Sequence, residues 1–443
     1  MPAKNALLDL GRVRRALRHP NYRLFFIGQG VSLIGTWLTR VALGWWVFRL
    51  TGSELILGTV SFAGQLPTFL LAPLGGVVVD RYDRHRLLVL TQVLAMLQSV
   101  LLTLLALSGQ ANVAYILSLA VFQGLINAFD TPARQSFIVE LVEAREDLPI
   151  AIALNSSMVN AARLVGPSFA GLLIAAFGEA GCFAIDSLSY LAVIASLLAM
   201  KVPKRERVKS SRRMFGDLGA GLAYAARSAP ISAILLLVAL VSLTGAPYTM
   251  LMPVLASQTL GGGAYTLGFL MAAAGAGAVM GALWLASRPS VLGLGRVMVI
   301  TSLSFGVGLV LLSLARSLWI ALPLLLVTGA GMMITLAASN TLLQTIVDED
   351  KRGRVMSLYT MAFFGMVPFG SLLAGWLANH VGAPVTIFGG GVLTALGGLT
   401  FWRQLPALRR AVRPIYVRLG ILPEAEVARG LQDAADMMRP PER

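Results

Sequence analysis

Apolar residues run in long blocks along this chain, and short polar turns separate the blocks. Twelve blocks are long enough to cross a bilayer, since a spanning helix needs about 20 mostly apolar residues. They cover residues 24–49, 55–79, 87–108, 112–130, 151–177, 181–200, 230–252, 265–287, 296–315, 318–339, 356–378 and 383–402. The pattern therefore predicts an all-α polytopic membrane protein with twelve transmembrane helices.

The composition agrees with a lipid environment. Of the 443 residues, 56% are hydrophobic and only 13% are charged, whereas soluble domains average about 25% charged residues. Cys182 is the single cysteine, so no intrachain disulfide can form. No cleavable signal precedes the first block, and residues 1–23 have the basic, amphipathic pattern of a helix that lies on a membrane surface.

Basic residues predict the orientation of the spans. With twelve crossings, 32 of the 36 Lys and Arg residues fall on the side that holds both termini. Arg49 and Arg316 fall on the opposite side, and Arg40 and Arg163 lie within spans. The positive-inside rule then places both termini in the cytoplasm, and we expect the protein to lie in a bacterial inner membrane. The net charge of +15 belongs to these membrane flanks, and we expect no nucleic-acid partner.

The longest internal polar stretch divides the spans into two sets of six. A loop of mixed charge followed by a helix with a central proline occurs in both sets, around Pro167 and around Pro368. Parallel six-helix repeats are one known transporter plan. The expected parts are a cytoplasmic arm (1–23), an N-terminal bundle (24–200), a basic central loop (201–229), a C-terminal bundle (230–402) and a cytoplasmic tail (403–443).

The turn after the second span carries charges of both signs, although positive charge alone would orient it. Asp80 ends its own helix, where the helix dipole disfavours an anion, and Gly75 and Gly76 would let a neighbour such as the eleventh span approach closely. Two interpretations stay open. The charges form a latch that closes between two halves of the protein, or they form a turn that stops and orients a helix.

Residues 76–86, GVVVDRYDRHR, resemble the loop 2–3 signature Gly-x-x-x-Asp-Arg-x-Gly-Arg-Arg/Lys of the major facilitator superfamily. Asp83 replaces the second glycine of the signature and His85 replaces a basic residue. The resemblance implies two six-helix bundles and a cytoplasmic gate that stabilises the outward-facing state through contacts to the eleventh span and loop 4–5. The residues that would carry this gate are Gly76, Asp80, Arg81, Arg84 and Arg86.

Residues 34–53, 127–142 and 151–171 resemble the branch of that superfamily that includes enterobactin exporters and macrolide efflux pumps. Gly166 and Pro167 also resemble the start of the antiporter motif of the fifth span. They predict a helix bend that either prevents proton leakage or is simply a kink.

Ionisable groups inside a bilayer are costly and mark functional sites by default. Arg40 either meets an anionic group of a substrate or pairs with a carboxylate that holds helices together. Arg163 either pairs with Asp130, meets cavity water or snorkels. Asp130 followed by Arg134 is interpreted as a gate pair in preference to a proton carrier. Asp186 is a proton-carrier candidate, although the resemblance places its span at the periphery.

Uncharged side chains complete the candidate substrate or coupling site: Thr36, Trp37, Gln123, Asn127 and Asn160. The chain has no phosphate-binding glycine loop, and its three histidines are scattered, so we expect no cofactor, no metal and no enzymatic activity.

The prediction is a secondary active transporter that works by alternating access as a monomer. The resemblance implies that it exports an amphipathic small molecule, a drug, a siderophore or similar, with protons as the coupling ion. One alternative keeps the fold and makes the protein a lipid or lysolipid facilitator. Another makes it a non-transporting receptor or assembly partner.

Overall fold

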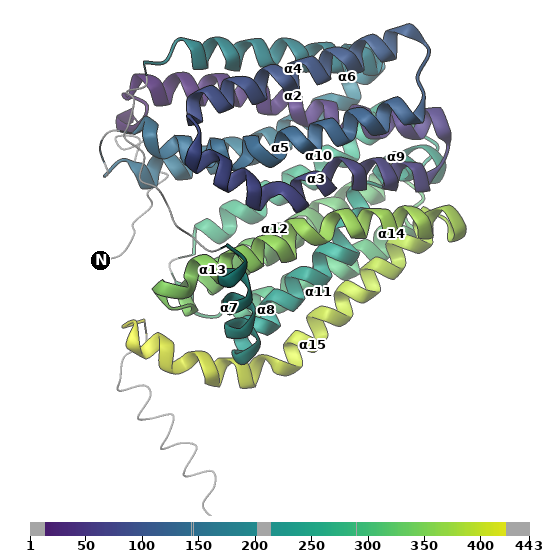
Figure 1. Cartoon of the computed structure of the whole chain (residues 1–443). Coiled ribbons are helices and arrows are strands. Elements are labelled where there is room, and N and C mark those ends of the chain that lie inside the picture. Colours follow the sequence, from purple (N-terminus) through teal and green to yellow (C-terminus); the bar gives the residue numbers. More distant parts are fainter. Residues whose placement is uncertain (1–13, 143, 145, 202–213, 289, 422–443) are drawn as a thin grey trace, which may run out of the picture.

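The structure is a computed structural model that describes residues 14–142, 144, 146–201, 214–288 and 290–421 (Figure 1). The described residues are helical with short turns and contain no β-strand. Eleven of their helices are long and apolar enough to cross a membrane. The predicted all-α polytopic fold is therefore confirmed.

The first half contains five of these helices, and the last one crosses twice. Helix α6 has 51 residues, about 76 Å at 1.5 Å per residue, roughly twice what a bilayer needs. Its helical torsions break at Gly178, where φ is 68° and ψ is −178°, a conformation that glycine adopts without steric cost. This turn separates the predicted fifth and sixth spans. The five helices are α2 (Pro20–Thr51), α3 (Glu54–Arg81), α4 (Arg84–Ser108), α5 (Val113–Leu141) and α6 (Leu148–Leu198).

The second half begins with a surface helix and an irregular span. Pro247 and Pro253 lack backbone N–H donors, and here the regular helix gives way to π and 3-10 turns that continue to Thr259, beyond the predicted end at residue 252. The elements up to this point are α7 (Met214–Arg227), α8 (Ala229–Leu240), η1 (Val241–Gly245), η2 (Ala246–Thr249), α9 (Met252–Val254) and η3 (Leu255–Thr259). The rest are α10 (Ala264–Ala286), α11 (Leu294–Leu314), α12 (Leu318–Ile346), α13 (Glu349–Thr360), η4 (Met361–Gly365), α14 (Met366–Val381) and α15 (Ala383–Arg418).

Several helices extend beyond the apolar blocks that predicted them. Helix α5 was predicted to end at residue 130 and ends at Leu141, and α15 was predicted to end at residue 402 and ends at Arg418. Polar residues can continue a helix beyond the lipid, because water satisfies their side chains. Hydropathy therefore marks the membrane crossing and not the full length of the helix. Part of the predicted arm (1–13), central loop (202–213) and tail (422–443) lies outside the described residues.

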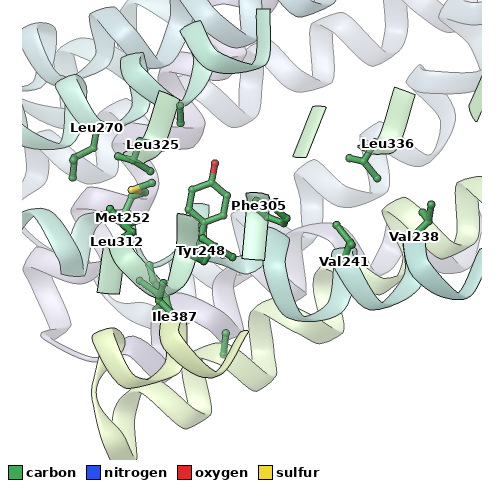
Figure 2. Packing of buried hydrophobic residues seen from close by; sticks show 14 of the residues in the cluster. Val238, Val241, Tyr248, Met252, Leu270, Phe305, Leu312, Leu325, Leu336 and Ile387 are labelled. Carbon is green, nitrogen blue, oxygen red and sulfur yellow. The ribbon is translucent and has the colours of Figure 1, made fainter. Parts of the chain in front are cut away.

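Fully buried apolar side chains hold each half together. In the first half, Phe25 of α2 packs against Phe137 of α5, with ring centroids 6.1 Å apart. In the second half, Tyr248 of η2 lies edge-on to Phe305 of α11, with centroids 6.0 Å apart (Figure 2). Burying a large side chain stabilises a fold by about 1.5–3 kcal/mol in water, whereas between helices in lipid the gain comes from close packing.

Polar contacts identify the two ends of the molecule. At the end where α2 begins, which we call the basic end, Arg84 lies 2.6 Å from Glu140 and His85 Nε2 lies 2.7 Å from the carbonyl oxygen of Leu197. At the opposite end, Arg49 of α2 lies 2.8 Å from Glu179, which follows the Gly178 turn. In Figure 1 the basic end is on the left, where α2 begins and α15 ends.

At the basic end, Asp348 connects three helices of the second half. Its carboxylate precedes α13, accepts a hydrogen bond from the Tyr224 hydroxyl of α7 at 3.2 Å, and lies 3.1 Å from Arg418 at the end of α15. The hydrogen bond from Tyr224, assisted by Arg418, lowers the pKa of Asp348. We call these three residues the Asp348 clasp. The clasp holds α7 and the end of α15, which is the helical start of the predicted tail, against the start of α13.

The halves touch each other near the opposite end. The Ser53 hydroxyl lies 3.2 Å from Asn379 Oδ1, and α3 and α14 approach so closely that a Cβ on Gly58 would lie 2.7 Å from the carbonyl oxygen of Ser371. Between α6 and α10, a Cβ on Gly171 would lie 2.6 Å from the Cα of Gly268. These contacts hold the two halves together at this end.

Candidate functional site

The gate motif lies on the turn between α3 and α4 at the basic end. Arg84 forms ion pairs with Asp80 at 3.8 Å and with Glu140 of α5 at 2.6 Å. Both partners belong to the first half, so these pairs brace the turn against α5. The Asp83 side chain caps α4 by accepting from the backbone N–H of Arg86 at 3.1 Å, and the Arg86 side chain is exposed.

The sequence had led us to expect that the eleventh span approaches Gly75 and Gly76, but it does not. Gly75 packs against α5, where its missing Cβ makes room for the Ala128 carbonyl, and a Cβ on Gly76 would meet no atom within 4 Å. Gly76 lies 18 residues after Gly58, five helical turns, so it shares the face of α3 that contacts α14. That face is covered at Gly58, near the opposite end, and uncovered at Gly76, near the basic end.

Midway along the molecule, two arginines lie against one tryptophan. The Arg40 guanidinium carbon lies 4.5 Å from the centre of the Trp37 ring, and that of Arg163 lies 5.1 Å from it. Gly166 lets α6 approach α2 here, since a Cβ would lie 2.5 Å from Trp37 Cβ. Arg40 is exposed although it lies in the middle third of α2. We call Arg40, Trp37 and Arg163 the arginine–indole cluster.

An ion pair with a carboxylate was one of the interpretations left open for each of these two arginines. Across the ranges that the structure describes, neither Arg40 nor Arg163 has a carboxylate within ion-pairing distance. Asp130, the suggested partner of Arg163, pairs with Arg134 one turn along α5 and accepts from Gln92 Nε2 at 2.7 Å. Local i,i+4 geometry therefore satisfies Asp130, and the interpretation of Arg163 as its partner is wrong.

Asp186 has a different environment. It is 2% exposed, on the second crossing of α6, and a Cβ on Gly35 of α2 would lie 2.6 Å from its Oδ1. Its oxygens accept from the hydroxyls of Ser99 at 3.2 Å and Ser189 at 3.4 Å. No ion pair to it occurs within the described residues. Asp186 is thus a membrane carboxyl held by hydroxyl groups, whereas Asp130 and Glu179 are each held by an arginine.

The remaining predicted residues divide into two groups. Thr36 joins the cluster to α6, because its hydroxyl lies 3.3 Å from that of Tyr190, next to the Asp186 turn. Gln123 and Asn127 bond to each other on α5 at 3.2 Å. Asn160 lines a small pocket between α6 and α10 together with Arg163, Leu164, Gly275, Ala278, Val279 and Ala282. Pro167 lies inside α6, one turn from Arg163. The only non-helical torsions of α6 are at Gly178, so the backbone keeps helical torsions at Gly166 and Pro167, where the sequence predicts a bend.

Sequence reasoning missed one contributor to this region. Tyr190 is 4% exposed and supplies the hydroxyl that contacts Thr36. A buried tyrosine needs a partner for its hydroxyl, which is the signal that would have singled out Tyr190.

The described residues form eleven helices long and apolar enough to cross a membrane, one of which is long enough to cross twice, and this is the fold of a major facilitator transporter. A bacterial homologue of the human lysosomal transporter Spinster shares this fold, with a TM-score of 0.70 and 14% identity over 90% of this chain and 98% of that one. The chain belongs to the transmembrane secretion effector family of the superfamily, whose family model matches residues 15–430.

This chain aligns with nearly the whole length of several relatives. The staphyloferrin A transporter of Staphylococcus aureus is 26% identical over 384 residues, covering 86% of this chain and 95% of that protein. The enterobactin exporter EntS of Shigella boydii is 26% identical over 419 residues, covering 92% and 98%. Macrolide efflux protein A of Streptococcus pyogenes is 25% identical over 377 residues, covering 82% and 92%. The chain is therefore a multi-pass membrane transporter with a small-molecule substrate, as predicted.

Proposed function

We propose that this protein exports an amphipathic small molecule from the bacterial cytoplasm by alternating access, driven by proton entry, as a monomer. The observation that carries the proposal is the position of the arginine–indole cluster. It lies midway along the spans, beside the pocket between α6 and α10, which belong to different halves. A midplane site between two bundles is what alternating access requires.

The structure corresponds in this proposal to the conformation closed at the opposite end. The basic end faces the cytoplasm, with both termini, by the positive-inside rule. Closing the basic end would bring the second half against the uncovered face of α3, at Gly76 and Asp80. Gly76, Asp80, Arg81, Arg84 and Arg86 then act as the cytoplasmic gate.

Asp186 is the proposed proton carrier. A buried carboxyl that has hydroxyl partners and no cation can be protonated without leaving a partner charge unpaired. Its position beside Gly35 of α2 and next to Tyr190, which contacts Thr36, connects it to the helix that carries Arg40. Asp130 with Arg134 serves as a structural pair near the gate.

The test is substrate accumulation in a bacterial host that lacks its own efflux pumps, with a macrolide, enterobactin and staphyloferrin A as labelled compounds. We expect this protein to lower the accumulation of at least one of them, and a protonophore or Asp186→Asn to abolish the effect. Asp350→Asn is the matched control, because the Asp350 side chain is 72% exposed on α13. Full export by Asp186→Asn in the presence of the protonophore would refute proton coupling.

Two outcomes would favour the alternatives. Transfer of a labelled lysolipid that does not depend on a pH gradient would identify a lipid facilitator. If no compound is moved in cells or in proteoliposomes by protein that is correctly folded, a receptor or assembly role replaces transport.

A further inference from the structure

We propose that the arginine–indole cluster binds the carboxylate of an amphipathic organic anion, so that the transported substrate carries negative charge. This inference rests on the proposed transport function and specifies the substrate class of the same site.

The first step is the contrast among the arginines of the spanning helices. Arg49 and Arg134 each have a buried carboxylate partner, Glu179 and Asp130. Arg40 and Arg163 have none in the described part of the chain, and both lie against the same Trp37 ring. A charged group in a bilayer needs a counter-charge or water. Two cations that share a site without an anion are therefore arranged to receive one.

The second step is the hydrogen-bonding capacity of the two guanidinium groups. Both lie against the Trp37 ring, where the cation–π interaction supports them. Neither donates a hydrogen bond to any described residue. Their N–H groups remain available to a ligand. Guanidinium matches the planar geometry of a carboxylate with two parallel hydrogen bonds.

The third step is the surface beside the charges. Arg163 and Asn160 are the polar side chains of the pocket between α6 and α10, and its remaining lining is apolar: Leu164, Gly275, Ala278, Val279 and Ala282. This lining, mostly apolar with two convergent polar side chains, has the chemistry of sites that bind an apolar body and orient one charged group. A cationic ligand would meet two like charges, and a neutral ligand would leave both of them unpaired.

The test compares three probes that share one ring system and differ in charge: 2-naphthoate, 2-naphthylmethanol and 2-naphthylmethylamine. Binding to the purified full chain in detergent is measured by equilibrium dialysis. We expect 2-naphthoate to bind at least tenfold more tightly than 2-naphthylmethanol. Of the three probes, 2-naphthylmethylamine should bind most weakly. Arg40→Gln and Arg163→Gln each weaken 2-naphthoate binding at least tenfold, and Arg→Lys at either site restores part of it.

Arg288→Gln is the matched control. Arg288 also stacks on a tryptophan, Trp284 at 5.3 Å, but it lies beyond the end of α10 and away from the pocket. We expect this variant to bind 2-naphthoate like the parent. Thermal unfolding of every variant separates loss of binding from loss of fold, and Trp37→Phe provides a second variant that keeps both charges.

Equal binding of the three probes, tighter binding of the amine, or absence of 2-naphthoate binding to folded protein would overturn the inference. Binding of lysophosphatidylglycerol without binding of 2-naphthoate would overturn it in favour of a lipid headgroup. Export of a neutral or cationic compound that survives both Arg→Gln changes would refute the charge preference and leave the transport function intact. Absence of all transport would refute the proposed function instead.

Discussion

Replacing Gly58 with alanine is expected to shift the protein away from the conformation described here. The new Cβ would lie 2.7 Å from the carbonyl oxygen of Ser371 and 3.0 Å from the Cα of Gly375, so backbone atoms of α3 and α14 must separate. Overpacking of this kind costs about 1–3 kcal/mol. The cost applies only while the opposite end is closed, so the ratio of this conformation to its alternative falls by about 5–150-fold.

The assay measures alkylation of Ser157→Cys by a water-soluble maleimide in purified protein. Ser157 is exposed and precedes Asn160 by three residues and Leu164 by seven, which places it on the pocket face of α6. The native Cys182 is fully buried and supplies only a slow background. In Gly58→Ala we expect slower alkylation, because opening the opposite end closes the basic end over residue 157.

The control is Gly76→Ala, since a Cβ at Gly76 meets nothing within 4 Å and so costs this conformation nothing. Alkylation should stay unchanged or become faster if closure of the basic end needs this glycine. The reasoning is refuted if Gly58→Ala and its parent react at the same rate while both remain folded.

Three further predictions concern stability, each measured by thermal unfolding of purified protein. Asp348→Asn should lower the unfolding temperature at pH 7. The lowered pKa of Asp348 means that its contribution is present above its unfolded pKa, about 3.9, and is lost as the pH falls through the folded value, so parent and variant should converge in acid. Phe305→Ala should cost about 3–5 kcal/mol because the ring is fully buried, whereas Phe364→Ala, at a residue 57% exposed, should cost far less; equal losses would contradict the packing described. Arg49→Gln leaves the buried Glu179 carboxylate unpaired and should cost about 1–3 kcal/mol, of which Glu179→Gln in the same protein restores part; additive losses would show that the pair does not interact.

Hydropathy alone predicted the fold class, because the bilayer imposes one requirement on every spanning segment. It also located the turn at Gly178 inside α6 from the short polar stretch between two apolar blocks. It failed at helix ends such as Leu141, where the helix continues beyond the lipid. It failed again at the seventh span, where prolines replace regular helix with π and 3-10 turns.

The candidate site was predicted residue by residue but not as a site. Charge inside an apolar block singles out Arg40 and Arg163 in the sequence, and Trp37 is distinguished by its depth. That both arginines lie against one indole depends on how α2 crosses α6 at Gly166, which is a tertiary contact. For the same reason the sequence suggested Asp130 as a partner for Arg163, whereas Arg134 on the same helix is nearer.

Alternating access is tested most directly by distances between spin labels at both ends of one molecule, measured by pulsed electron resonance. One pair joins residues 50 and 381 at the opposite end, where the native Leu50 and Val381 are 45% and 51% exposed. The other joins residues 82 and 349 at the basic end, where Tyr82 is 64% exposed and the Glu349 side chain 92%. On adding 2-naphthoate or changing pH, the two distances should change in opposite directions. Distances that lengthen together, or that never change in protein that transports, would contradict alternating access.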